Sequence, residues 1–290
     1  MPQIAPNAYI DPKARLADDV RVGPNSCVGP DVVVGPGCRL ENNVTLQGPA
    51  VIGPENEFYP NCVIGGDPQD LKYKGGPTEL VIGSKNIFRE CVTVNRGTEL
   101  GGGKTSIGDG NLFMAGVHVG HDSIIEDHVI VANNVLIGGH VKLERCAVIG
   151  GGAAIHHFAT IGRNAMVGGL TRVVADVPPY MIFEGNPGSI RGVNTKGLAR
   201  NGFTEEQIEA VKQVYKKLFR AGNFTGALDE LIQLNGQDPV IRYLIEFMQH
   251  SLEGKYGRYR ESIRHDKPED LGDFYKDKDN GKDKDKDPPK

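Results

Sequence analysis

The sequence predicts a mainly β protein, a parallel β-helix of hexapeptide repeats, followed by a small C-terminal α-helical domain. The first observation is that an aliphatic residue or Phe returns at every sixth position in long stretches between Ile4 and Val173. The second is that the residue four positions after each of these is mostly small or branched. The third is that apolar residues beyond residue 200 follow the spacing of amphipathic helices.

A period of six fits neither the 3.6 residues of a helical turn nor the simple alternation of a strand. It is the repeat of a parallel β-helix, in which three hexapeptides close a triangular coil of about 18 residues, and coils stack at a strand spacing of roughly 4.8 Å. The large and the small residue of each repeat are expected to fill the interior. Hexapeptide prisms similar to this one are left-handed, and the similarity implies a left-handed parallel β-helix here.

We expect the β-helix to occupy residues 1–190, the helical domain residues 191–262, and a charged, disordered tail residues 263–290. Two stretches break the repeat and are expected to leave the coil as loops, residues 65–81 and residues 95–106. The repeat keeps its phase across the first loop, which indicates a loop about one coil long, and shifts by one residue across the second. Surface loops of solenoids commonly carry binding groups.

The second loop contains Gly101-Gly102-Gly103-Lys104-Thr105, which is close to a phosphate-binding P-loop. That motif requires Gly at position 98, which is Thr98 here, and a helix directly after it. The hexapeptide repeat resumes instead, so we expect no nucleotide-phosphate loop at this place.

The C-terminal domain is predicted to contain three helices after an irregular stretch that follows the last repeat. The first begins with the capping box Thr204-Glu205-Glu206-Gln207 and stops at Gly222. The second ends at Asn235-Gly236. The third opens with Asp238 as its N-cap and ends near Gly254.

Composition narrows the class of protein. A net charge of −4 and a pI near 6.1 give no basic footprint, so we expect no nucleic-acid partner. The five cysteines include no Cys-x-x-Cys pair, and Cys38, Cys62 and Cys146 are expected at small interior positions as reduced thiols. The repeat begins at once, without a signal peptide, and no apolar run approaches 18 residues. We therefore expect a cytoplasmic protein without a membrane span.

Residues 18 positions apart between Ile107 and Val173 are expected to stack on successive coils, because the phase is constant in this stretch. The polar residues of three neighbouring columns then lie along one strip: His121, Gly139 and His157; Asp122, His140 and Phe158; Gly120, Gly138 and His156. His118 lies just upstream of this strip.

Such a strip indicates catalysis rather than a non-catalytic scaffold. It offers an imidazole base, a carboxylate to orient the base, and backbone N–H groups able to meet an oxyanion. A zinc site is the competing interpretation, because imidazole is a common zinc ligand. Zinc-bearing prisms that resemble gamma-class carbonic anhydrases use a His-x-x-x-x-His pair, which neither His118-x-x-His121 nor His156-His157 matches. We expect no metal and no cofactor.

Several motifs along roughly residues 1–255 resemble those of one enzyme family, the acyl-[acyl-carrier-protein]–UDP-N-acetylglucosamine O-acyltransferases that begin lipid A synthesis. The motifs are Gln69-Asp70-Leu71-Lys72-Tyr73, Asn95-Arg96-Gly97-Thr98, His118-Val119-Gly120-His121-Asp122, the run from Ile149 to Phe158, Met166-Val167-Gly168-Gly169, Asp176-Val177-Pro178-Pro179-Tyr180, Glu184-Gly185-Asn186 and the run from Gly192 to Leu198.

The resemblance implies a role for each matching residue. His121 is implied as the general base and Asp122 as its neighbour, and the backbone N–H of Gly139 as the group that meets the oxyanion. Gly169 matches the position that limits acyl length, and the absence of a side chain there implies a long chain. The substrate-binding positions are implied at Asp70, Lys72, His118, His140, His156, His157, Asn194 and Arg200.

The partners implied by the resemblance are acyl carrier protein carrying a 3-hydroxyacyl chain and UDP-N-acetylglucosamine, with a homotrimer whose active sites lie between neighbouring prisms. The chain departs from the common family residues at Asn95, His157, Lys196 and Asn201. These departures leave open an amino-sugar analogue of the acceptor. A further alternative is the related N-acyltransferase that acts later in the pathway, which usually has an additional N-terminal domain.

Overall fold

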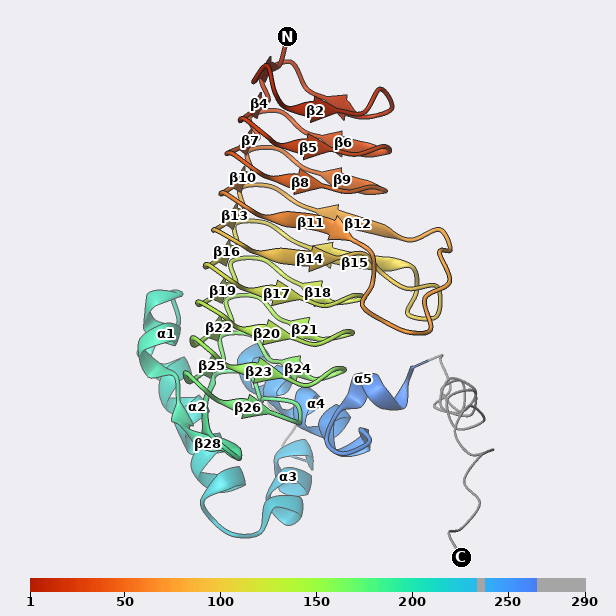
Figure 1. The fold of residues 1–290 in the computed structure, drawn as a ribbon. Helices are drawn as coiled ribbons and strands as arrows, with labels where there is room; N and C mark the ends of the chain where they lie inside the picture. The colour runs from red at the N-terminus through yellow and green to blue at the C-terminus, as the bar shows by residue number, and fades with distance from the viewer. Residues whose placement is uncertain (234–237, 265–290) are drawn as a thin grey trace, which may run out of the picture.

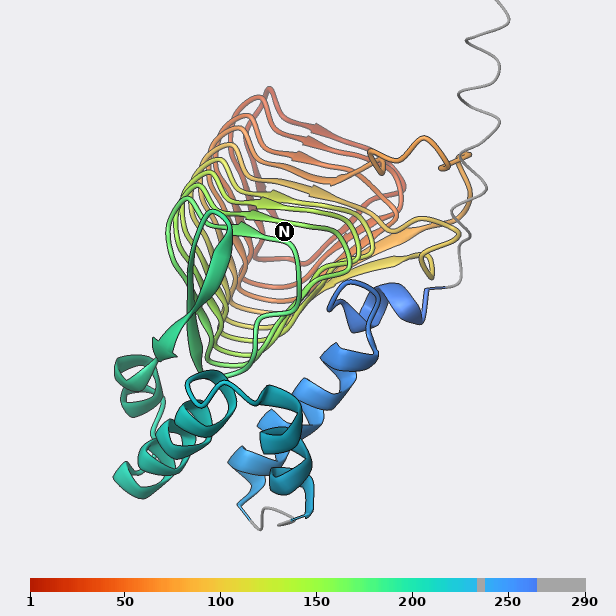
Figure 2. The ribbon, with the colours of Figure 1, turned by 90° about the horizontal axis from the view of Figure 1, so that it is seen from below.

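The structure, a computed structural model, describes residues 1–233 and 238–264. Parallel strands form the three faces of a long prism, and the helices gather beside the end opposite the N-terminus (Figure 1). Seen along its axis, the prism is a stack of triangular coils with the helices on one side (Figure 2). The prediction of a β-helix followed by α-helices is confirmed. In the described part of the chain, no helix is both long and apolar enough to cross a bilayer.

Three sheets contain all the strands of the described residues. The first sheet contains, in spatial order, β1 (Gln3–Ile4), β4 (Arg21–Val22), β7 (Arg39–Leu40), β10 (Glu57–Phe58), β13 (Ile87–Phe88), β16 (Leu112–Phe113), β19 (Ile130–Val131), β22 (Val148–Ile149), β25 (Met166–Val167), β27 (Met181–Gly185) and β28 (Gly188–Val193). The second contains β2 (Tyr9–Ile10), β5 (Cys27–Val28), β8 (Thr45–Leu46), β11 (Val63–Gly66), β14 (Thr93–Asn95), β17 (His118–Val119), β20 (Leu136–Ile137), β23 (Ala154–Ile155) and β26 (Arg172–Val173). The third contains β3 (Arg15–Leu16), β6 (Val32–Val34), β9 (Ala50–Ile52), β12 (Glu79–Ile82), β15 (Lys104–Ile107), β18 (Ile124–Ile125), β21 (Lys142–Leu143) and β24 (Thr160–Ile161).

Strand pairing fixes the length of each coil. Leu136 pairs with His118, 18 positions earlier, as the hexapeptide period predicts. Leu80 pairs with Ala50, so that coil has 30 residues and its loop adds 12. His118 pairs with Thr93, so that coil has 25 residues and its loop adds seven. The first loop is therefore not one coil long, as the sequence indicated: it preserves the phase because 12 is a multiple of six, whereas seven shifts the phase by one.

The loops themselves are shorter than expected, because the strands on either side continue past the last hexapeptide position. Residues 67–78 connect β11 to β12, and residues 96–103 connect β14 to β15. Both loops project from the same corner of the prism (Figure 2).

The large position of the repeat fills the interior from Val22 onward. Phe58, Phe88 and Phe113 stack on successive coils with ring centroids 4.9 Å apart, which reproduces the strand spacing in their side chains. Cys38 and Cys62 are buried as expected, and burial raises the pKa of the Cys62 thiol to about 12.

The interior position predicted for Cys146 is wrong. This residue is half-buried and occupies a turn with φ of 60°, and the following residue, Ala147, fills the interior. The phase shift at the second loop moves the interior position by one residue, which the cysteine assignment did not take into account.

The stretch after the last repeat is not irregular, which corrects the sequence prediction. β27 continues the first sheet in parallel with β25, and β28 returns antiparallel to β27. The prolines at positions 178 and 179 end the hexapeptide repeat but not this sheet. Such a hairpin has no period of six, so the repeat gave no signal for it.

Five helices follow in the described residues: α1 (Thr195–Arg200), α2 (Glu205–Phe219), α3 (Phe224–Gln233), α4 (Pro239–Glu253) and α5 (Tyr259–Ser262). The capping box at Thr204 and the N-cap at Asp238 are confirmed. The short helices α1 and α5 were not predicted. The predicted end of the second helix at positions 235–236 lies outside the described residues, as do residues 265–290 of the expected tail.

Candidate active site

The strip of polar residues lies on one corner of the prism, where the chain passes from the second sheet to the third. His140 N donates a hydrogen bond to His121 O at 2.8 Å, and Phe158 N donates one to Gly139 O at 3.1 Å. The rings of His140 and Phe158 stack with centroids 4.3 Å apart. The predicted columns are therefore confirmed in their register, and the polar groups do converge.

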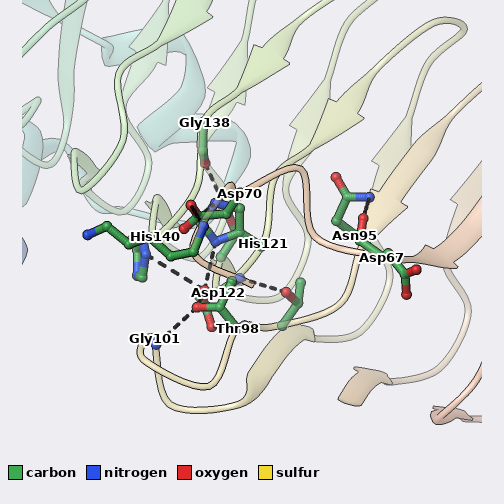
Figure 3. Close-up of polar contacts among 12 residues, drawn as sticks. Asp67, Asp70, Asn95, Thr98, Gly101, His121, Asp122, Gly138 and His140 are labelled. Atoms are coloured by element: carbon green, nitrogen blue, oxygen red, sulfur yellow. Dashed lines mark hydrogen bonds and ion pairs between the residues drawn. The ribbon is translucent and has the colours of Figure 1, made fainter. Parts of the chain in front are cut away.

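A histidine and an aspartate form the centre of this corner. The Nδ1 atom of His121 lies 2.7 Å from Oδ2 of Asp122 (Figure 3). The Asp122 side chain is buried, whereas that of His121 is partly exposed. A carboxylate on Nδ1 leaves Nε2 of the neutral imidazole as the acceptor, so the ring can take a proton at that atom.

The second loop holds Asp122 in place. Oδ1 of Asp122 accepts a hydrogen bond from Thr98 N at 2.9 Å, and Oδ2 accepts one from Thr98 Oγ1 at 2.7 Å. Asp122 N in turn donates to Thr105 Oγ1 at 2.8 Å. The carboxylate thus reaches the imidazole from a fixed position. In the sequence, Thr98 had appeared as a mismatch to a P-loop and as part of the motif Asn95-Arg96-Gly97-Thr98, without a role of its own.

The first loop brings a second carboxylate to His121 from the opposite side. Oδ2 of Asp70 lies 4.0 Å from Nε2 of His121, and Oδ1 of Asp70 accepts a hydrogen bond from Lys72 N at 3.0 Å. The two loops, separated in sequence by β12 to β14, therefore place their polar groups on either side of the same imidazole (Figure 3).

A cavity of about 500 Å³ opens in front of this imidazole. Its lining combines the apolar Leu136 and Ala154 of the second sheet with polar groups at the corner and in the loops. The polar lining residues are Gln69, Asn95, His118, His121, His156, His157 and Arg172, and Gly138 and Gly139 contribute bare backbone.

Gly139 allows the backbone to approach the imidazole. A Cβ atom at this position would lie 2.6 Å from Nε2 of His121, a distance at which atoms overlap. The backbone of Gly139 thus lies beside Nε2 of His121, with no room for a side chain between them.

Two of the histidines that line the cavity, His118 and His157, have pKa values below the ordinary value of the side chain. Burial, with a smaller contribution from the charge of His121, lowers the pKa of His118. Burial and the neighbouring His156 lower the pKa of His157. A neutral imidazole can both donate and accept a hydrogen bond, so these two side chains can bind uncharged polar groups.

Not all the expected binding residues meet in this cavity. His140 lies behind Asp122, with Nε2 3.7 Å from Oδ2 of that residue, and lines a neighbouring cavity. Asn194 is buried as the N-cap of α1, where Oδ1 accepts from Gly197 N and Nδ2 donates to Asn164 O. Arg200 is exposed on α1, on the side of the prism away from the two loops (Figure 1).

Gly169 lies at a different corner, next to Gly151, whose oxygen would be 3.3 Å from a Cβ atom there. The second sheet, which carries Leu136 and Ala154, lies between this corner and that of His121. An extended apolar ligand bound along that face would reach from one corner to the other.

One group of donor atoms at the corner could in principle hold a metal ion. His121, Asp122 and His140 each offer a ligand atom within 4.8 Å of the others. Oδ2 of Asp122 is already engaged by the imidazole and by Thr98 Oγ1. This arrangement fits a hydrogen-bonded base better than a tetrahedral ion site.

Two family models match the chain. One, a UDP-N-acetylglucosamine O-acyltransferase domain 2 model, matches residues 176–256. The other, the bacterial transferase hexapeptide model, matches residues 1–36 and 104–139.

Two similar proteins match most of the chain. The chain is 50% identical over 257 residues to a protein of Akkermansia muciniphila, and 46% identical over 252 residues to one of Saccharophagus degradans. Both are acyl-[acyl-carrier-protein]–UDP-N-acetylglucosamine O-acyltransferases by name. These alignments cover 88% and 87% of this chain and 99% and 98% of the relatives.

A solved structure agrees in fold. The UDP-N-acetylglucosamine O-acyltransferase (LpxA) of Moraxella catarrhalis superposes with a TM-score of 0.81 at 39% identity, covering 84% of this chain and 95% of its own. The left-handed parallel β-helix is thus the fold of this chain as well, and the chain belongs to the family of acyl-[acyl-carrier-protein]–UDP-N-acetylglucosamine O-acyltransferases.

Proposed function

We propose that this protein transfers a 3-hydroxyacyl chain from acyl carrier protein to the 3-hydroxyl of UDP-N-acetylglucosamine, the first step of lipid A biosynthesis. The observation that carries the proposal is the His121–Asp122 pair, 2.7 Å apart, whose imidazole faces the cavity. An acyl transfer to a hydroxyl group needs a base at this place, and family membership identifies the class of acceptor and donor.

In the proposed reaction, Nε2 of His121 takes the proton of the sugar hydroxyl as that oxygen attacks the thioester carbon. The carbonyl electrons move to the oxygen, and the N–H of Gly139 donates to the resulting oxyanion. The intermediate collapses, the carbon–sulfur bond breaks, and the imidazolium returns its proton to the departing thiolate. General base catalysis of this kind contributes about 10²- to 10⁴-fold.

Asp122 orients the imidazole and stabilises its charged form during the reaction. Asp70, 4.0 Å from Nε2, would face the bound sugar from the first loop. Lys72, His118, His156 and His157 contribute to binding around it, and the apolar face of the second sheet receives the acyl chain toward Gly169. A glycine at that position leaves room for a long chain.

The enzyme works as a cytoplasmic homotrimer in this proposal. Asn194 and Arg200 are implied in substrate binding, yet neither lines the cavity of its own chain. A neighbouring prism placed against the second sheet would supply such residues. Size determination in solution by light scattering tests the trimer, and a monomer with full activity would contradict it.

A second acceptor, the 3-amino analogue of the sugar, is favoured by one observation. Oδ1 of Asn95 is buried beside the cavity without a hydrogen-bond donor among the described residues, and Nδ2 donates to Asp67 O at 2.8 Å. An amino group on the substrate could donate to Oδ1, whereas a hydroxyl group has only one proton to give.

The test is a transfer assay with UDP-N-acetylglucosamine or its 3-amino analogue and 3-hydroxyacyl carrier proteins of graded chain length. Transfer to the hydroxyl acceptor that prefers long chains, and that is lost in His121→Ala with the oligomer intact, is the expected result. Transfer only to the amino analogue would show that the 3-amino sugar is the acceptor instead. Full activity of His121→Ala would overturn the mechanism.

A further inference from the structure

The chain after α4 turns back along the corner that carries the candidate active site. Lys255 and Arg258 form an isolated bridge, and α5 follows at once. The match to the domain 2 family model ends at residue 256, so α5 and residues 263–264 lie beyond the residues that this model matches. In both ribbon views, α5 lies close to the corner from which the two loops project (Figures 1 and 2).

This C-terminal segment, residues 257–264, follows one column of the prism. The column consists of Asp122, His140, Phe158 and Asp176, each 18 positions after the last. The segment contacts its last three members in turn. Tyr259 N donates to Oδ2 of Asp176 at 3.1 Å, the guanidinium of Arg264 lies 5.3 Å from the ring centroid of Phe158, and Nε of Arg260 donates to His140 O at 2.9 Å.

Buried contacts anchor the segment at its beginning. Arg258 is buried, donates to Val174 O at 2.6 Å, and forms an ion pair with Glu261. Asp176 N donates to Gly257 O at 2.8 Å. These contacts hold the backbone against the last coil, so the position of Arg260 relative to His140 is determined.

His140 links this segment to the base. Its ring stacks on Phe158, meets His121 edge-on with centroids 5.1 Å apart, and places Nε2 3.7 Å from Oδ2 of Asp122. A displacement of the His140 backbone would therefore move a ring that contacts both members of the His121–Asp122 pair.

We propose that residues 257–264 form a positioning element for the active site, and that Arg260 is a positioning residue that acts through His140. The hydrogen bond from Arg260 to the carbonyl of His140 fixes the turn that presents the His140 imidazole to Asp122. The inference rests on the proposed role of His121 as the base. Since misplacement of a catalytic group by about 1 Å can cost roughly 10²-fold in rate, a single such bond has a measurable effect.

The first experiment measures kcat and KM of Arg260→Ala in the full chain, with the melting temperature of the oligomer. We expect kcat to fall about tenfold at an unchanged melting temperature, as for the loss of a charge-assisted hydrogen bond. Arg260→Lys should recover much of the rate, because its ammonium can still donate to the carbonyl. Arg242→Ala, which removes an exposed arginine from α4, is the matched control and should behave as the unaltered protein.

The second experiment is a double-mutant cycle with His140→Ala. If Arg260 acts through the His140 ring, Arg260→Ala has no further effect on kcat once that ring is absent. Additive losses, or a normal kcat in Arg260→Ala, would overturn the inference. A loss of activity proportional to a loss of folded oligomer would overturn it as well, since that is a structural effect alone. His121→Ala in the same assay separates the two proposals: its inactivity beside a fully active Arg260→Ala rejects only the positioning role.

Discussion

Asp122 and His121 are consecutive in the chain, yet their side chains are hydrogen-bonded, with Nδ1 of the imidazole 2.7 Å from Oδ2 of the carboxylate. Asp122 has φ of 58°, and the stacked residues His140 and Phe158 have 60° and 65°. This left-handed turn conformation, which aspartate and asparagine tolerate better than most residues, is the ordinary corner of the β-helix. The proposed catalytic pair thus uses a turn geometry that recurs on the two following coils of the same column.

Replacing Asp122 with Asn should lower kcat by about 10²- to 10⁴-fold, because an amide nitrogen beside Nδ1 favours the wrong imidazole tautomer. Steady-state kinetics at saturating substrate measures the effect. Asp18→Asn removes a carboxylate that is 94% exposed and serves as the control. A rate for Asp122→Asn within a few-fold of the original would show that the carboxylate does not orient the base.

Replacing Thr98 with Val should lower kcat by about 10- to 100-fold, since a hydrogen bond to a charged group contributes roughly 1.5–3 kcal/mol. The variant keeps the shape of the side chain and the bond from Thr98 N, but loses the 2.7 Å bond from Oγ1. Thr98→Ser should restore most of the rate. Equal rates for Thr98→Val and Thr98→Ser would mean that the hydroxyl is not needed.

Replacing Gly139 with Ala should reduce kcat at least about 10²-fold, because the added Cβ overlaps the His121 ring and displaces it. Gly192→Ala is the control, since a Cβ there meets nothing within 4 Å. Both variants should have the same size in solution as the original protein. Retained activity in Gly139→Ala would mean that the His121 ring can move aside without loss of function, because alanine keeps the backbone N–H.

Replacing Gly169 with Met should shift the preference toward shorter acyl chains without a comparable loss of rate on the best chain. A side chain at this exposed corner would project from a backbone that lies beside Gly151 and occupy the far end of the apolar face. Competition between carrier proteins of graded chain length measures the preference. The same chain preference before and after the change would place the end of the acyl chain elsewhere.

Burial raises the pKa of Asp176 to about 6. Because this value lies above that of an unfolded chain, the folded state binds the proton more strongly, and the corresponding stability is present below about pH 4 and is lost as the pH rises through about 6. A difference of this size between the folded and unfolded pKa corresponds to about 3 kcal/mol. The side chain of Asp176→Asn cannot titrate. The free energy of unfolding of this variant, measured with denaturant at several pH values, should therefore rise relative to that of the original protein between about pH 4 and 6. A constant difference across this range would contradict the raised pKa.

The sequence predicted the columns at the corner of His121 because the period of six fixes the register: once Ile107 and Val173 share one phase, His140 must stack on Asp122. The partners that come from loops could not be predicted in the same way. Thr98 and Asp70 belong to insertions that have no period, and their approach to His121 depends on tertiary contacts. The hairpin β27–β28 and the helix α5 were missed for a related reason, since each is too short or too irregular to give a periodic signal.

The hairpin β27–β28 makes the two ends of the prism unlike. At the N-terminal end, β1, β2 and β3 present unpaired backbone, with Ile4 and Tyr9 exposed. At the other end, the antiparallel strand β28 closes the first sheet and interrupts the parallel ladder. A second molecule could continue that ladder only by pairing its first coil in parallel with the last coil of its neighbour. Because β28 is antiparallel, the first sheet offers no parallel strand edge at this end with which another molecule could pair. This disfavours end-to-end growth of the solenoid into fibres.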